Sequence, residues 1–153
     1  MLDAQLTWRQ IVVLRAYAKY LRQAGIAFSQ LYIERVLTLN VAIARLLVRL
    51  FESRFDPSRQ AGEAERSEAI TEEIRGQLDE VAILDHDRIL RSYLGLILAT
   101  LRTSFFQADY DPGRLASPGE PPYLVIKLAA RQVPELPAPG HRREPQVHRL
   151  QPR

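Results

Sequence analysis

Apolar side chains recur at helical spacing along most of the chain. In residues 5–24, one apolar row has spacings of three, four and seven: Leu6, Val13, Tyr17, Tyr20 and Ala24. Such spacing places the side chains on one face of an α-helix. The same kind of pattern predicts five helices, over residues 5–24, 29–37, 41–55, 63–82 and 86–106.

Residues at the ends of these segments favour the same boundaries. The expected N-caps of the second, third and fifth helices, and the left-handed C-terminal cap of the first, are Ser29, Asn40, Asp85 and Gly25. Pro57 cannot continue a helical hydrogen-bond ladder, so the third helix should end just before it. A polar hinge near residues 56–62 then leads into the fourth helix, which is strongly acidic and should present a solvated face.

The pattern changes after the fifth helix, which is apolar around most of its circumference and should lie at the centre of the body. Residues 123–128 are rich in strand formers and predict one β-strand, with no second convincing strand to pair with it. Recurrent proline among basic and polar residues predicts a disordered tail. The expected fold is mainly α: a bundle-like helical domain over 1–106, a loop and strand over 107–139, and a basic, Pro-rich tail over 140–153.

Composition excludes several classes of protein and of functional site. The chain has 153 residues, 46% of them hydrophobic and 25% charged, as in a soluble globular domain. It has no Cys, which excludes disulfides, Cys-based zinc sites and thiol nucleophiles. The net charge of +3 comes entirely from residues 140–153, because residues 1–139 carry 17 basic and 17 acidic side chains. A neutral body with a short basic tail predicts no nucleic-acid binding.

Membrane insertion and secretion are not expected either. The longest stretch without charge, residues 92–101, has ten residues, whereas a membrane-spanning helix needs about 20. The N-terminus lacks a basic region followed by an apolar run, so no secretory signal is visible. We therefore expect a cytoplasmic location.

Three groups of residues could carry chemistry. Asp85, His86 and Asp87 suggest a metal or acid–base site, but neighbouring helical side chains diverge, and carboxylates at a helix start fit capping. Asp109 and Asp111 resemble calcium ligands, but the Gly and Glu of an EF-hand loop are missing, so a turn is expected.

The third group consists of arginines beside apolar residues in the third helix: Arg45, Arg49 and Arg54. This helix could lie on an anionic membrane. A core helix with arginine stems at its edges has the same pattern, and we expect the core helix. The glycines are scattered singly, with no phosphate-binding loop. From its residues alone, the chain has no expected catalytic, cofactor-binding or metal site.

Several segments resemble the large bacterial NAD-specific glutamate dehydrogenases. Their order and spacing are similar to the helical stretch before that family's catalytic domain: residues 7–10, 14–23, 29–34, 84–91, 99–103, 124–128 and 133–137. The resemblance implies a parent enzyme that uses NAD to deaminate L-glutamate oxidatively to 2-oxoglutarate and ammonia. It also implies that the catalytic lysine and the dinucleotide fold lie downstream. The chain then looks like an internal fragment, a non-catalytic helical scaffold that needs no cofactor by itself.

The resemblance ends after Pro139, where the family pattern continues into strands and this chain becomes basic and Pro-rich. Permitted codons for residues 147–152, read one nucleotide later, can spell the family's Phe-Ile-Val-Tyr-Ser-Pro. We hypothesise a change of reading frame near residue 140, which the coding DNA would test.

Two partner arrangements follow from these expectations. As a fragment, the chain would contact the remainder of the parent polypeptide and, alone, would expose apolar surface. The alternative is a stand-alone helical interaction or oligomerisation module, in which the apolar faces of the third and fifth helices self-associate or bind a partner.

Overall fold

The computed structural model describes residues 6–58, 61–106, 124–129, 132 and 147–150. Five helices are followed by three short strands: α1 (Trp8–Gln23), α2 (Gln30–Leu39), α3 (Val41–Phe55), α4 (Glu63–Asp79), α5 (Leu84–Ala99), β1 (Thr100–Thr103), β2 (Leu124–Leu128) and β3 (Val147–Leu150). The mainly α class and the five predicted helices are confirmed.

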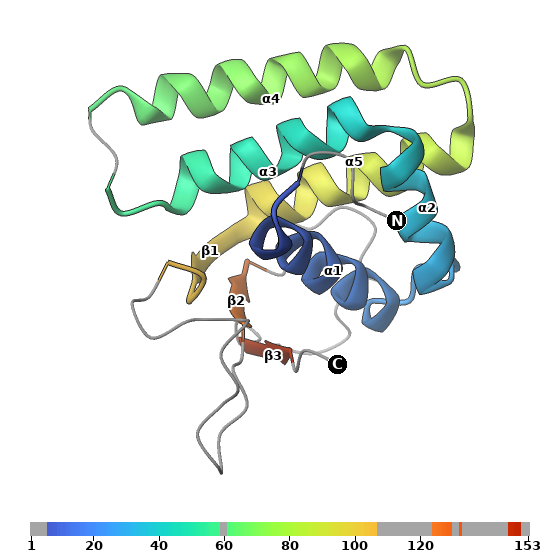
Figure 1. Ribbon diagram of the computed structural model, residues 1–153, viewed down its shortest axis with the longest axis horizontal. Coiled ribbons are helices and arrows are strands. Elements are labelled where there is room, and N and C mark those ends of the chain that lie inside the picture. Colours follow the sequence, from blue (N-terminus) through green and yellow to red (C-terminus); the bar gives the residue numbers. More distant parts are fainter. Residues whose placement is uncertain (1–5, 59–60, 107–123, 130–131, 133–146, 151–153) are drawn as a thin grey trace.

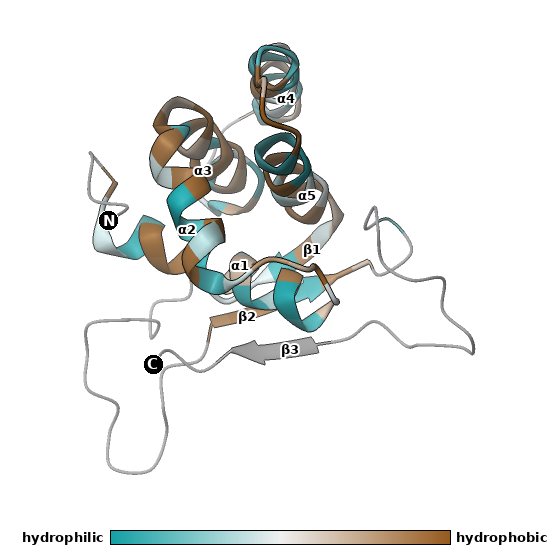
Figure 2. Cartoon of the chain, turned by 90° about the vertical axis from the view of Figure 1, so that its right-hand side faces the viewer, coloured by the Kyte–Doolittle hydropathy of each residue, from teal (hydrophilic) through white to brown (hydrophobic). Residues whose placement is uncertain are grey.

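The elements form successive layers. In both views α4 lies at one end, above α3 and α5, and β2 lies toward the other end, below α1 (Figure 1, Figure 2). β1 leads from the end of α5 toward β2 (Figure 1). Figure 2 also shows that α4 is coloured largely hydrophilic, whereas α3 carries much hydrophobic colour. The four helices between α4 and the sheet therefore form the body of the molecule.

Local hydrogen bonds explain where α1 begins and ends. The Thr7 hydroxyl accepts from the Gln10 amide at 3.3 Å, and the Gln10 side chain accepts from the Thr7 amide at 2.9 Å, which together form a capping box. At the other end Gly25 has a φ of 97°, and the Ile26 amide reaches back to the Leu21 carbonyl at 3.0 Å. The left-handed cap predicted at Gly25 is therefore confirmed.

The two expected caps around α2 have different outcomes. Ser29 caps α2, because its hydroxyl accepts from the Tyr32 amide at 3.1 Å. Asn40 occupies the N-cap position of α3 but makes no cap bond there. Its amide nitrogen instead donates to the Val36 carbonyl at 2.8 Å. The expected role of the Asn40 side chain is therefore wrong: it binds a carbonyl in the last turn of α2.

The expected bounds of α5 are wrong at both ends. The helix begins at Leu84 with Ile83 as its N-cap, so Asp85 lies within the first turn and is not the cap. It ends at Ala99, and Thr100 turns into β1 with a ψ of 126°. Leu101 and Phe105 continue the helical spacing of apolar residues, so the sequence pattern predicts a helix that is too long. β-branched Thr at 100 and 103 fits a strand better than a helix.

The strands form one antiparallel sheet in the order β1–β2–β3. β2 agrees with the predicted strand and alternates buried with half-buried residues. The expectation of a single strand is wrong, because β1 supplies a partner from within the predicted fifth helix. Within the predicted tail, Val147–Leu150 form β3 and pair with β2. The other residues of the predicted tail lie outside the described residues.

A single hydrophobic core runs through all five helices and the sheet. α3 contributes strongly to this core, and eight of its 15 residues are buried: Ile43, Ala44, Leu46, Leu47, Val48, Leu50, Phe51 and Ser53. In α5 nine of the 16 residues are buried, which agrees with its predicted place at the centre of the body. The helices therefore cover one another's apolar faces within one chain.

Candidate functional site

The imidazole between two carboxylates does not form a converging site. His86 is buried at 8% exposure, packs edge-to-face with Tyr32, and has its Nδ1 3.4 Å from the amide nitrogen of Asn40. That nitrogen is a donor, so Nδ1 acts as the acceptor and the proton sits on Nε2. Asp85 is exposed. His86 thus joins the N-terminal end of α5 to α2 and has no carboxylate partner among the described residues.

Asp87 has a structural partner of its own. Its carboxylate accepts from Arg91 Nε at 2.7 Å, one turn along α5. The same guanidinium reaches Asp79 of α4 at 3.0 Å. These hydrogen bonds, to Asp79 first and Asp87 second, raise the pKa of Arg91. The three groups connect the end of α4 to the start of α5, as surface ion pairs of modest strength.

The arginines of α3 also have structural positions. The apolar residues beside them, including Leu47, Leu50 and Phe51, are fully buried. An apolar face that is already covered cannot lie on a membrane, and the core helix is confirmed. The same burial removes the faces of α3 and α5 that the alternative module would use for self-association. Asp109 and Asp111, the other pair that we considered, lie outside the described residues.

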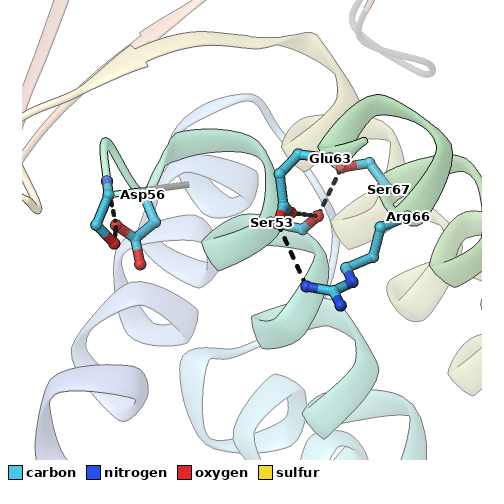
Figure 3. Close-up of polar contacts among 6 residues, drawn as sticks. Ser53, Asp56, Glu63, Arg66 and Ser67 are labelled. Atoms are coloured by element: carbon cyan, nitrogen blue, oxygen red, sulfur yellow. Dashed lines mark hydrogen bonds and ion pairs between the residues drawn. The ribbon is translucent and has the colours of Figure 1, made fainter. Parts of the chain in front are cut away.

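A buried polar contact joins α3 to α4 (Figure 3). The hydroxyl of Ser53, at 3% exposure, lies 2.7 Å from the Ser67 hydroxyl and donates to Glu63 Oε2 at 3.3 Å. Arg66 holds the other oxygen of Glu63 at 3.3 Å. Because Ser53 is buried and Glu63 is already paired with Arg66, the group is best explained as a structural link between two helices.

A second buried polar group lies where α5 becomes β1. Thr100 Oγ1 donates to the Leu96 carbonyl at 2.7 Å, and the Tyr17 hydroxyl lies 2.7 Å from the same oxygen. Since the single Thr100 proton is used on Leu96, Tyr17 must be the donor to Thr100. The result is a hydrogen-bond chain from α1 through Thr100 to the last turn of α5.

Two arginines and a second tyrosine reach the same region. Arg54, near the end of α3, donates to the Leu98 carbonyl at 3.1 Å and to the Thr100 carbonyl at 3.5 Å. Arg9 donates to the Phe105 carbonyl at 2.6 Å, and its guanidinium lies 4.9 Å from the Phe105 ring centre. The Tyr93 hydroxyl donates to the Leu14 carbonyl of α1 at 2.8 Å. We call Arg9, Tyr17, Arg54 and Thr100 the junction cluster.

Burial changes the ionisation of this region. Loss of solvent raises the pKa of Tyr17 above its usual value, although the Thr100 hydrogen bond and the charge of Arg54 oppose the shift. Burial also raises the pKa of Tyr93, with a further contribution from Glu34. For Arg54, burial lowers the pKa and the interaction with Tyr17 opposes this. Both tyrosines therefore remain neutral donors inside the fold.

We expect the chain to lose stability in alkali. The folded state keeps the Tyr17 and Tyr93 protons, whereas the unfolded chain releases them near the ordinary tyrosine pKa of about 10. Unfolding then releases protons, so the free energy of unfolding is undiminished below this pH and falls above it, by about 1.4 kcal/mol per pH unit per tyrosine. Urea unfolding at a series of pH values measures the slope. Tyr17→Phe should reduce the slope of the free energy of unfolding against pH by the contribution of one tyrosine, and an unchanged slope would contradict this.

Sequence reasoning did not identify the junction cluster. Tyr17 appeared only as a member of an apolar row, and Thr100 lay inside a predicted helix. The partners are far apart in the chain, so no local spacing could predict them. The one available signal was β-branched Thr at 100 and 103 near the end of the helical pattern.

In the part of the chain that the structure describes, no three His, Asp or Glu side chains lie close enough together to hold a metal ion. No helix in that part combines the length and apolar character needed to cross a bilayer.

The chain matches two family models in succession. Residues 1–57 match "Glutamate dehydrogenase, helical motif 3", and residues 73–151 match "Bacterial NAD-glutamate dehydrogenase, catalytic domain". The catalytic-domain match thus begins in α4, earlier than expected, and runs past Pro139. The residues between the two matches, 58–72, include most of the predicted hinge at 56–62. The domain division near 106 and the reading-frame hypothesis stay predictions.

Curated relatives resemble nearly the whole chain. It is 44% identical over 142 residues to the NAD-specific glutamate dehydrogenase of Mycobacterium tuberculosis, and 45% identical over 141 residues to that of Pseudomonas aeruginosa. The enzyme of the same name from Halomonas elongata is 43% identical over 138 residues. These alignments cover 90–92% of this chain but 8% of each relative. The resemblance identified from sequence segments is therefore confirmed, and the chain belongs to the bacterial NAD-glutamate dehydrogenase family.

Proposed function

We propose that the chain serves as a non-catalytic helical scaffold segment of an NAD-dependent glutamate dehydrogenase. The parent enzyme would deaminate L-glutamate oxidatively to 2-oxoglutarate and ammonia while reducing NAD. The observation that supports this best is the identity of 43–45% to three relatives named as NAD-specific glutamate dehydrogenases. NAD is accordingly the cofactor of the parent enzyme, and none is expected for this chain alone.

The described residues support a scaffold role. Three of their buried polar side chains, on His86, Ser53 and Thr100, bond to residues that come from other helices. Hydride transfer needs a cofactor held against the substrate and a base of suitable pKa. In this proposal both come from other parts of the parent polypeptide, and the present segment supports their placement.

The purified chain should therefore produce no NADH from L-glutamate and NAD. Absorbance at 340 nm, compared with the same protein after heat denaturation, measures the rate. A rate above that background, dependent on both substrates, would contradict the non-catalytic role. Addition of a relative's full-length enzyme to the same cuvette confirms that the assay conditions permit turnover.

The proposed partner is the remainder of the parent polypeptide. Since the faces of α3 and α5 are buried, contact would use the large apolar side chains that remain exposed: Trp8, Leu31, Leu39, Ile83, Leu84 and Leu101. The matched relatives extend far beyond the aligned region, so chain that could cover these residues exists in the parent. A cytoplasmic location is part of this proposal, because glutamate and NAD are cytoplasmic metabolites.

A further inference from the structure

The junction cluster connects the two matched segments of the chain. Three of its side chains, on Arg9, Tyr17 and Arg54, belong to the segment that matches helical motif 3. Their acceptors, on Leu98, Thr100 and Phe105, belong to the segment that matches the catalytic domain. The arginine bonds end on main-chain carbonyls, and the tyrosine bond ends on the threonine at the helix-to-strand turn.

These hydrogen bonds hold the main chain in place where α5 ends and β1 begins. Arg54 holds the carbonyls of Leu98 and Thr100, on either side of the point where α5 ends. Arg9 holds the carbonyl of Phe105, two residues beyond the end of β1. Donors from α1 and α3 thus hold the main chain both before and after β1.

The sheet depends on β1 for its position. β1 pairs with β2, and the register shifts between Thr100 and Arg102, directly beside the clamped carbonyl. The Ala129 amide donates to the Ala99 carbonyl at 2.8 Å, and the Ser104 amide donates to the Val125 carbonyl at 3.0 Å. A displacement of the helix-to-strand turn would therefore move β2 along with β1.

We propose that Arg9, Tyr17 and Arg54 are positioning residues that fix the orientation in which the sheet leaves the helical body. A movement of α1 or α3 is then transmitted to the sheet through these bonds. In the parent enzyme this would couple helical motif 3 to the catalytic domain, a consequence that rests on the proposed function. The clamp itself is a property of the present chain.

Hydrogen exchange on the purified chain tests the clamp without any enzyme assay. Arg54→Met keeps an unbranched stem and removes the donors, so the amides of Ser104 and Ala129 should exchange roughly tenfold faster through local opening. Amides in the middle of α3 should keep their rates. Arg54→Lys retains a donor and should restore part of the protection.

Arg49→Met is the matched control. Arg49 lies on the same helix, is exposed, and makes no hydrogen bond or ion pair with other residues in the described ranges. This variant should leave exchange at Ser104 and Ala129 unchanged. If Arg54→Met does not fold, Tyr17→Phe gives the same test through the Thr100 hydroxyl.

Two results would overturn the clamp. One is unchanged exchange at Ser104 and Ala129 in both Arg54→Met and Tyr17→Phe. The other is equal acceleration in the sheet and in the middle of α3, which would mean a loss of global stability without a positioning role. Neither result bears on whether the chain belongs to a glutamate dehydrogenase, so the clamp and the proposed function fail separately.

Discussion

Replacement of Phe51 by alanine is expected to lower the free energy of unfolding by about 3–5 kcal/mol. Phe51 is fully buried, and its ring centre lies 6.1 Å from that of Tyr17, 5.4 Å from Phe105 and 6.1 Å from Phe106. The side chain therefore connects α3 to α1 and to the turn that follows β1. Its removal leaves a cavity where the helices meet the chain that leads away from the sheet.

Urea unfolding followed by circular dichroism measures this loss. Leu31→Ala is the matched control, since Leu31 is 79% exposed and its removal should change stability by less than about 0.5 kcal/mol. A loss below about 1 kcal/mol for Phe51→Ala would show that the core is not packed as described, because large-to-small changes at buried aromatic residues cost several times more.

Thr100→Val should cost more stability than Tyr17→Phe. Valine keeps the shape of threonine but leaves the buried Tyr17 hydroxyl without its acceptor and the Leu96 carbonyl without its hydroxyl donor. A buried polar group left unpaired costs about 1–3 kcal/mol. In Tyr17→Phe, by contrast, Thr100 keeps its bond to Leu96, so the cost should be that of one net hydrogen bond, about 0.5–1.5 kcal/mol.

The double variant separates these effects. In the Tyr17→Phe background, Thr100→Val no longer leaves the Tyr17 hydroxyl without an acceptor. The double variant should therefore lose less stability than the two single losses combined. Urea unfolding of the four proteins gives the coupling between the two residues. Strict additivity would contradict the direct hydrogen bond, as would a larger loss for Tyr17→Phe than for Thr100→Val.

The sequence predicted local structure well where local signals decide it. Ser29, Gly25 and Pro57 mark helix ends through backbone chemistry that acts within a few residues, and the structure agrees at each. The burial of α3 followed from its apolar spacing. Family membership followed from the segments that resemble glutamate dehydrogenases.

The errors arose where distant contacts decide the structure. The apolar row of α5 continues through Leu101 and Phe105, so spacing alone extended the helix. Strand pairing with β2 and the bonds from Tyr17 and Arg54 end it at Ala99 instead. The Asn40 side chain likewise could bond to the start of α3 or to the end of α2, and it bonds to the Val36 carbonyl of α2.

The expectation that a fragment exposes apolar surface does not hold for α3 and α5. As a fragment, the chain was expected to expose the apolar faces of its helices, but those of α3 and α5 are covered by the other helices and the sheet. Membership of a much larger enzyme family and a covered core are compatible, because a segment of a large protein can have a core of its own. Both matched segments share this one core.

Equilibrium unfolding followed by two probes tests whether the two segments share a core. Trp8, the single tryptophan, reports on the first matched segment through its fluorescence, whereas far-ultraviolet circular dichroism reports on the helices of both. A shared core predicts one cooperative transition with the same urea midpoint for both probes. Two separate transitions, with the tryptophan signal changing apart from the helical signal, would contradict it.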